Sequence, residues 1–174
     1  RASQSPWPPA SRLFVAIRDA GGQGDWLARW IDVEDAGAAG HDLADGLGAW
    51  AQKACQAWHV VAYDGLPDFG PQPDLNELLA YMDAVDEYGE AFEKLWGSRR
   101  FTGVIKAAEA FADGYQGTYP DAVAWARHYL ALMGEPPLPE AGLDFDAYAR
   151  AAEARGDVQF LPADGGGLHV FWRD

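Results

Sequence analysis

The sequence predicts an α+β protein in which a helical middle lies between two mixed units. Three observations lead to this class: strand-like apolar runs at residues 12–18 and 58–63, an apolar stripe of helical period after residue 74, and two alternating apolar runs around the last glycines. The order of these patterns divides the chain into a disordered leader, rich in proline, and three small consecutive domains. We expect these parts at residues 1–11, 12–73, 74–111 and 112–174.

The N-terminal domain is predicted to be a small β-β-α-β unit. Arg12–Arg18 has strand composition, and the glycine-rich segment after it favours a turn that leads to a hairpin partner at Trp26–Val33. Asp42–Ala57 is expected to be a helix, because Asp42 is a good N-cap and apolar residues follow at helical spacing. Trp58–Tyr63 is then the third strand.

The central domain is predicted to be helical and to begin after a proline-rich boundary. Asp74 is expected to cap a helix with one core-facing apolar stripe, at positions 75, 78, 79, 82 and 85. Asp83, Glu87 and Glu90 then lie together on an adjacent flank. The last short helix of this domain is expected at Val104–Ala112. Three glycines are expected to break the region into short helices: Gly89, Gly97 and Gly103.

The C-terminal domain is predicted to contain two helices and a β-hairpin. Thr118 is expected to cap the first helix, with Asp121 three residues later, and Gly134 to end it. The second helix is expected at Asp144–Arg155, capped by Asp144 and terminated by the glycine that follows. Alternating residues at 158–161 and 168–172 flank a turn with three glycines, which predicts the hairpin.

Charge is the feature that bears most directly on function. The chain has 27 acidic and 13 basic residues, a formal net charge of −14, and each predicted domain is acidic. Direct nucleic-acid binding is therefore not expected, because phosphate contact needs clustered Lys and Arg, whereas a basic partner is favoured. From Asp64 to Glu93 there are nine carboxylates and no Lys or Arg, interspersed with apolar residues. That pattern predicts a folded element which holds its charges in one arrangement.

No catalytic, metal or cofactor site is predicted. Cys55 and His59 have a spacing that could reach one metal ion, but no second pair completes a site. The glycine clusters do not match a phosphate-binding loop, and no apolar run approaches the ~20 residues that span a bilayer. The single cysteine fits a reducing cytosol, so a cytoplasmic protein is expected.

Several segments resemble the ArdA family of antirestriction proteins. Tyr115–Ala126, followed by Gly134 and a proline stretch, is similar to that family, as is Phe145–Val158 with the hairpin that ends in Gly167–Phe171. The upstream segments fall in the family's order, so the similarity runs from about residue 12 to the end. The chain departs from the pattern at Arg99 and Arg100, a basic pair that could interrupt the acidic surface or form an internal salt bridge.

The resemblance implies an elongated, curved homodimer with three small domains per chain, encoded on a mobile genetic element. Its carboxylates would imitate the phosphates of bent duplex DNA and occupy the DNA groove of type I restriction-modification enzymes, without enzymatic activity. The dimer contact would lie in the C-terminal domain, near Glu135–Tyr148. The expected partner-binding acids are Asp64, Asp68, Asp74, Glu77, Asp83, Asp86, Glu87, Glu90, Glu93, Glu109, Asp113, Asp121, Glu135, Glu140, Asp144 and Asp146.

Two other functions remain open from the residues alone. A generic acidic binding module would use the same charge on another basic DNA-binding protein. An acidic hydrolase would instead need a deep pocket that contains two carboxylates with different pKa values.

Overall fold

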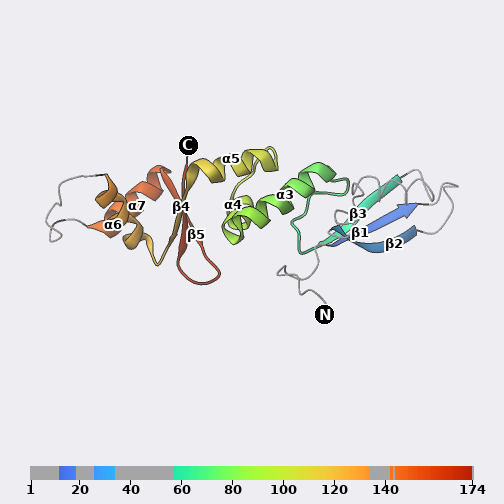
Figure 1. The fold of residues 1–174 in the computed structure, drawn as a ribbon, viewed down its shortest axis with the longest axis horizontal. Coiled ribbons are helices and arrows are strands. Elements are labelled where there is room, and N and C mark those ends of the chain that lie inside the picture. Colours follow the sequence, from blue (N-terminus) through green and yellow to red (C-terminus); the bar gives the residue numbers. More distant parts are fainter. Residues whose placement is uncertain (1–11, 19–25, 34–56, 134–141, 143, 174) are drawn as a thin grey trace. The chain divides into compact units, whose positions relative to one another are not determined.

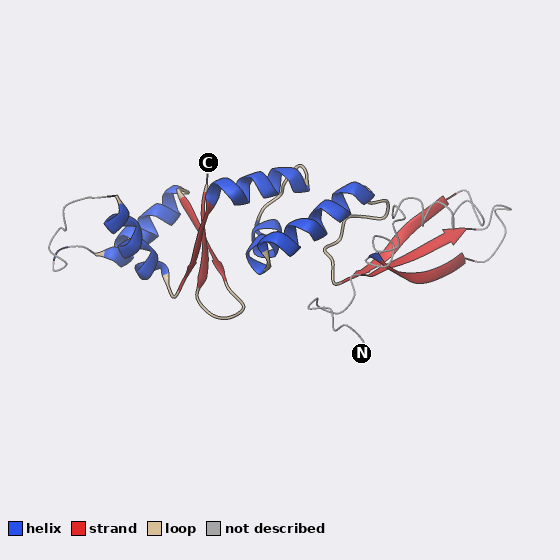
Figure 2. Cartoon of the chain, in the orientation of Figure 1, coloured by secondary structure: helices blue, strands red, loops and turns tan. Residues whose placement is uncertain are grey.

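The computed structural model describes residues 12–18, 26–33, 57–133, 142 and 144–173 (Figure 1). Within these residues the protein is α+β, with five helices and two three-stranded antiparallel sheets (Figure 2), which confirms the predicted class. The chain divides into two compact units, Arg1–Leu79 and Ala80–Asp174. Their boundary falls inside helix α3 (Leu75–Tyr88). The division into three domains and the elongated shape remain predictions.

The first unit contains a sheet of strand order β2-β1-β3, formed by Arg12–Arg18 (β1), Trp26–Asp32 (β2) and Ala57–Asp64 (β3). The central strand buries Leu13 and Val15 completely, as the apolar run predicts. The three predicted strands are confirmed, although Val33 lies just beyond the end of β2. The predicted helix at 42–57 lies outside the described residues, except for its last residue, which begins β3.

Helix α3 begins after Asp74, whose Oδ1 accepts a hydrogen bond from the backbone N–H of Asn76 at 2.9 Å. The helix ends at Tyr88, and Gly89 takes a φ of 65° that separates it from α4 (Glu90–Ser98). Glu90 therefore does not share a helix with Asp83 and Glu87, which corrects the predicted flank. The cap at Asp74 and the break at Gly89 are confirmed.

The prediction that Gly97 breaks the helical region is wrong, because Gly97 lies inside α4. A glycine costs a helix only about 1 kcal/mol relative to alanine. Phe92 and Leu95 of the same helix are fully buried, and burial of two such side chains outweighs that cost. Gly103 does precede the next helix, α5 (Val104–Gly114), as predicted.

A short strand, β4 (Tyr115–Tyr119), follows α5 directly, and the sequence analysis did not predict it. Thr118 belongs to this strand and pairs with His169, so its predicted role as a helix cap is wrong. Asp121 caps α6 (Ala122–Leu132) instead, and its Oδ1 accepts from the N–H of Ala124 at 2.7 Å. Helix α6 ends at Leu132, and the predicted end at Gly134 lies outside the described residues.

The second sheet has strand order β4-β6-β5, with β5 at Val158–Pro162 and β6 at Leu168–Trp172. Helix α7 (Phe145–Arg155) precedes it, and the side chain of Asp144 accepts from the N–H of Ala147 at 2.9 Å. The helix closes on Gly156 at a φ of 82°. The second helix and the hairpin are therefore confirmed, and β4 extends the hairpin to three strands.

Helices cover both faces of the second sheet, α4 and α5 on one side and α6 and α7 on the other (Figure 1). The central strand β6 shows the two faces, because successive side chains point in opposite directions. Trp172 meets the ring of Trp125 of α6 at 5.9 Å, whereas Phe171 meets the ring of Phe111 of α5 at 5.7 Å. Double coverage explains why β6 has a nearly continuous apolar sequence.

Phe111 is the centre of the packing on the α4–α5 side. Its buried ring lies 4.6 Å from the ring of Tyr88 and 4.7 Å from that of Tyr115. The rings of Phe92 and Phe171 lie at 6.1 and 5.7 Å. One aromatic side chain thus joins α3, α4, α5, β4 and β6 within residues 80–174.

We predict that Gly167→Ala lowers the free energy of unfolding by about 1–3 kcal/mol or more. This is the usual cost of placing a residue other than glycine in a strained backbone region. Gly167 has a φ of +91°, and a Cβ there would lie 2.5 Å from the carbonyl oxygen of Tyr119 at the end of β4. Gly165→Ala is the matched control, because a Cβ at that position meets nothing within 4 Å. Urea unfolding of the full chain checks the pair. Equal stability of the two variants would contradict the described approach of β4 to β6.

Candidate functional site

Three exposed carboxylates lie at the C-terminal end of α3: Asp83, Asp86 and Glu87. Positions i, i+3 and i+4 share one face of a helix, so these side chains form a short row, which we call the carboxylate row. Among the described residues, no ion pair joins a member of the row to a Lys or Arg. Glu93, on α4, is also exposed. The row is therefore available to a positive partner.

Neighbouring tyrosines show the effect of these acids on local electrostatics. Burial raises the pKa of Tyr88, and the charge of Glu87 and a hydrogen bond to it raise that pKa further. Burial likewise raises the pKa of Tyr81, with a smaller contribution from the charge of Glu93. A negative potential disfavours the phenolate, so both phenols stay neutral at physiological pH.

Other predicted site acids have structural roles. Asp74, Asp121 and Asp144 accept backbone hydrogen bonds at helix starts, where the helix dipole favours negative charge. Three more form exposed ion pairs: Asp64 with Arg12 at 2.5 Å, Glu109 with Lys106 at 2.6 Å, and Asp146 with Arg150. All but Asp146, which is half-buried, remain exposed, but their charge is partly engaged within the protein.

Glu90 differs from the exposed acids, because it is half-buried and faces the second sheet. Its Oε1 accepts a hydrogen bond from the backbone N–H of Asp164 at 2.5 Å and lies 3.4 Å from Nε2 of His169. Sequence reasoning missed His169 and Asp164. His169 lies in the predicted strand at residues 168–172, but its partner Glu90 is 79 positions away in the chain, so no local pattern indicates the contact.

The remaining predicted acids do not join one cluster. Glu77 is half-buried on α3, and Asp113 is exposed on α5. Glu135 and Glu140 lie outside the described residues. In the basic pair, the Arg99 guanidinium lies 5.2 Å from the ring centre of Phe101, and Arg100 is exposed.

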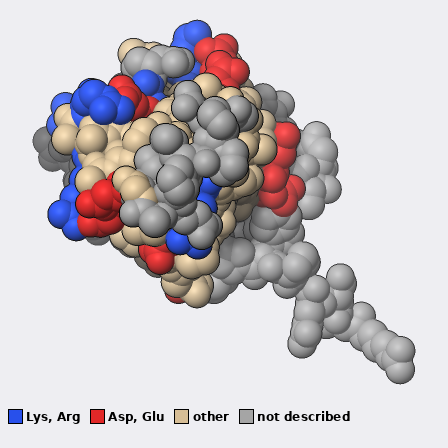
Figure 3. Space-filling view, turned by 90° about the vertical axis from the view of Figure 1, so that its left-hand side faces the viewer, with Lys and Arg blue, Asp and Glu red and all other residues tan. Residues whose placement is uncertain are grey.

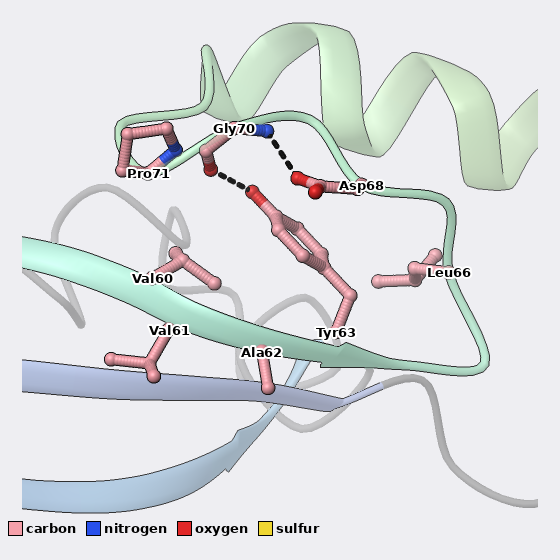
Figure 4. Close-up of a pocket in the computed structure, with 8 residues that line it drawn as sticks. All are labelled: Val60, Val61, Ala62, Tyr63, Leu66, Asp68, Gly70 and Pro71. Carbon is pink, nitrogen blue, oxygen red and sulfur yellow. Dashed lines mark hydrogen bonds between the residues drawn. The ribbon is translucent and has the colours of Figure 1, made fainter.

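A shallow pocket of about 400 Å³ lies beside β3 in the first unit (Figure 4). Tyr63 crosses it and donates its hydroxyl hydrogen to the carbonyl oxygen of Gly70 at 2.6 Å. Asp68, the one carboxylate among the described residues that line it, accepts from the N–H of Gly70 at 2.7 Å. The described lining therefore does not supply the two carboxylates that a hydrolase of the predicted kind requires.

The end of the second unit that carries α6 and α7 presents both signs of charge (Figure 3). The ion pairs Arg150–Asp146 and Arg155–Asp157 account for part of this mixture. The acidic character of the chain is thus uneven at its surface. In the described part of the chain, no group of three or more His, Cys, Asp or Glu residues is placed to hold a metal ion, and no helix is long and apolar enough to cross a bilayer.

We predict that Glu87→Gln lowers the pKa of Tyr88 toward its ordinary value without restoring it, because burial is the larger cause of the increase. A neutral amide removes the charge that disfavours the phenolate. An NMR pH titration of tyrosine-labelled protein measures this. Glu153→Gln on α7 removes one exposed acid elsewhere and should leave Tyr88 unchanged. An unchanged Tyr88 titration in Glu87→Gln would show that the two side chains do not interact.

Comparison with known proteins places the chain in a family. Residues 17–165 match the family described as Antirestriction protein (ArdA). Comparison with curated individual proteins finds no match. The family match spans more than four fifths of the chain, from the end of β1 to the turn before β6, includes the carboxylate row, and agrees with the resemblance in the sequence. The chain therefore belongs to the ArdA antirestriction family, whose members are inhibitors that act on restriction-modification systems.

Proposed function

We propose that this protein imitates bent duplex DNA and competes with DNA for the binding groove of type I restriction-modification enzymes. Family membership supports an antirestriction role. The carboxylate row on α3 is the observation that supports mimicry, since its three acids are exposed and none is in an ion pair among the described residues. A groove built for a polyanion presents Lys and Arg, which such a row attracts.

The charge density of the row is compatible with this role. Asp83, Asp86 and Glu87 fall within five residues of α3, which span about 7.5 Å at a rise of about 1.5 Å per residue. One strand of B-DNA carries about one charge per 3.4 Å of axis. The row therefore reaches at least the density of one strand over a short length. Imitation of a whole groove would need other exposed acids as well, such as Asp68, Glu93 and Asp113.

A folded mimic has an energetic advantage over DNA itself. Bending a duplex of 20–30 base pairs by 40–90° costs about 1–6 kcal/mol, whereas a protein that already has the required curvature avoids that cost. Preorganisation of this kind increases affinity without additional contacts. We further propose that three domains arranged in an elongated, curved homodimer supply the length, with the dimer contact in the C-terminal domain, and that the protein acts in the cytoplasm against restriction of plasmid or phage DNA.

We predict that neutralising the row, by Asp83→Asn, Asp86→Asn and Glu87→Gln together, weakens inhibition of a type I enzyme about 10- to 100-fold. Exposed charge pairs contribute up to about 1 kcal/mol each, and 1.4 kcal/mol corresponds to about tenfold. Each single change should have a small effect. The measurement is displacement of a labelled DNA duplex from the purified enzyme.

The matched control neutralises three acids that form ion pairs: Glu109→Gln, Asp146→Asn and Asp157→Asn. Net charge changes equally in both triple variants, so the comparison separates the position of the charge from its total. Equal inhibition by the two variants would contradict a specific role of the row. Retention by immobilised wild-type protein of another basic DNA-binding protein, but not of the type I enzyme, would favour the generic binding module.

A further inference from the structure

A group of charged and titratable side chains ties α4 to the second sheet: Glu90, Lys94, Asp164 and His169. Lys94 lies one turn after Glu90, and its Nζ is 2.5 Å from Oδ1 of Asp164. Glu90 accepts from the backbone N–H of the same Asp164 at 2.5 Å. The turn between β5 and β6 is thus held through both the backbone and the side chain of one residue. We call these four residues the corner clamp.

His169 is the buried member of the clamp, with 8 % of its side chain exposed. Its Nε2 faces Glu90, and its Nδ1 lies 3.0 Å from the hydroxyl of Thr118 and 3.3 Å from that of Tyr115. Both ring nitrogens therefore have polar partners, from α4 on one side and from β4 on the other. A shift of α4 would leave a buried imidazole nitrogen and a carboxylate without partners, so the contact favours one arrangement of helix and sheet.

The corner clamp lies next to the end of α3, the helix that carries the carboxylate row. The row occupies the last two turns of α3, Gly89 then turns the chain, and Glu90 is the first residue of α4. A change in how α4 sits on the sheet would therefore change where α3 points. The stacking of Tyr88 on Phe111 fixes the end of α3 to the same core. The stack therefore holds the chain just before Gly89, and the corner clamp holds it just after Gly89.

We propose that the corner clamp positions the carboxylate row for its partner, so that Glu90, Lys94, Asp164 and His169 determine inhibition without touching the target. This inference rests on the proposed function. Glu90 then has a different role from the exposed acids. Lys94 and His169 also contribute to inhibition, although neither adds negative charge.

Substitution of Lys94 gives the sharpest test. A mechanism based on net charge alone and one based on positioning of the row predict opposite changes in inhibition. Lys94→Ala removes a cation and makes the protein more acidic, so attraction to a basic groove alone would maintain or strengthen inhibition. Loss of the tie to Asp164 would instead weaken inhibition about two- to fivefold, the range of an exposed ion pair. Lys106→Ala is the matched control, because Lys106 pairs with Glu109 within α5 and, in the described part of the chain, forms no ion pair with another element.

The experiment measures DNA displacement from a type I enzyme by the wild-type chain and both variants, with far-UV circular dichroism to verify folding. Weaker inhibition by Lys94→Ala, but not by Lys106→Ala, supports the proposal. Inhibition by Lys94→Ala equal to or stronger than that of wild type overturns it, and so does an equal loss in both variants. If the wild-type chain displaces no DNA, the proposed function itself has failed.

His169→Gln and Glu90→Gln extend the test to the buried contact. His169→Gln removes no carboxylate, yet it should weaken inhibition about tenfold, the effect of about 1.4 kcal/mol. The double variant should lose less than the sum of the two single losses, because both remove one interaction. The same comparison of single and double variants, made by urea unfolding, detects the contact through the free energy of unfolding even if no enzyme is inhibited. Strict additivity in both measurements would overturn the clamp.

Discussion

The packing of aromatic rings around Phe111 is the interaction on which the acidic surface depends. Residues 80–174 contain 16 acidic and 8 basic residues, a formal charge of −8, and mutual repulsion opposes a compact arrangement of them. Rings from α3, α4, β4 and β6 converge on Phe111 of α5. Loss of one buried Phe side chain typically costs about 3–5 kcal/mol, whereas an exposed charge pair contributes about 1 kcal/mol or less, so one buried ring offsets several repulsive pairs.

The carboxylates that surround this core divide into groups with different tasks. Asp121 and Asp144 begin helices, and their charge also suits the helix dipole. Glu90 faces inward toward His169, where it connects a helix to a sheet. Asp83, Asp86 and Glu87 are exposed and form no ion pair among the described residues. In our proposal this last group meets the partner directly, together with other exposed acids, whereas Asp121, Asp144 and Glu90 stabilise the fold that carries them.

Local patterns in the sequence predict much of the fold and only part of the site. The stripe after Asp74 and the caps at Asp74 and Asp144 depend on neighbouring residues, so they can be recognised in sequence. The predicted flank contains Asp83 and Glu87 of the exposed row, but it includes Glu90 in place of Asp86. Strand β4 depends on pairing with β6 about fifty residues later, which local propensity does not reveal. For this reason the local pattern at Thr118 predicts a helix cap where the structure has a strand. The contact of Glu90 with His169 is also non-local, and for that reason Glu90 could not be distinguished from the exposed acids.

Simultaneous equilibrium binding of the wild-type chain and a DNA duplex to one purified type I enzyme tests the central claim most directly. If the chain occupies the DNA groove, it and DNA compete strictly. The apparent Kd for DNA then rises linearly with the concentration of the chain, and no ternary complex forms. The interaction should also weaken steeply as salt increases, because it depends on charge. A ternary complex of enzyme, DNA and chain, with an unchanged Kd for DNA, would contradict the account.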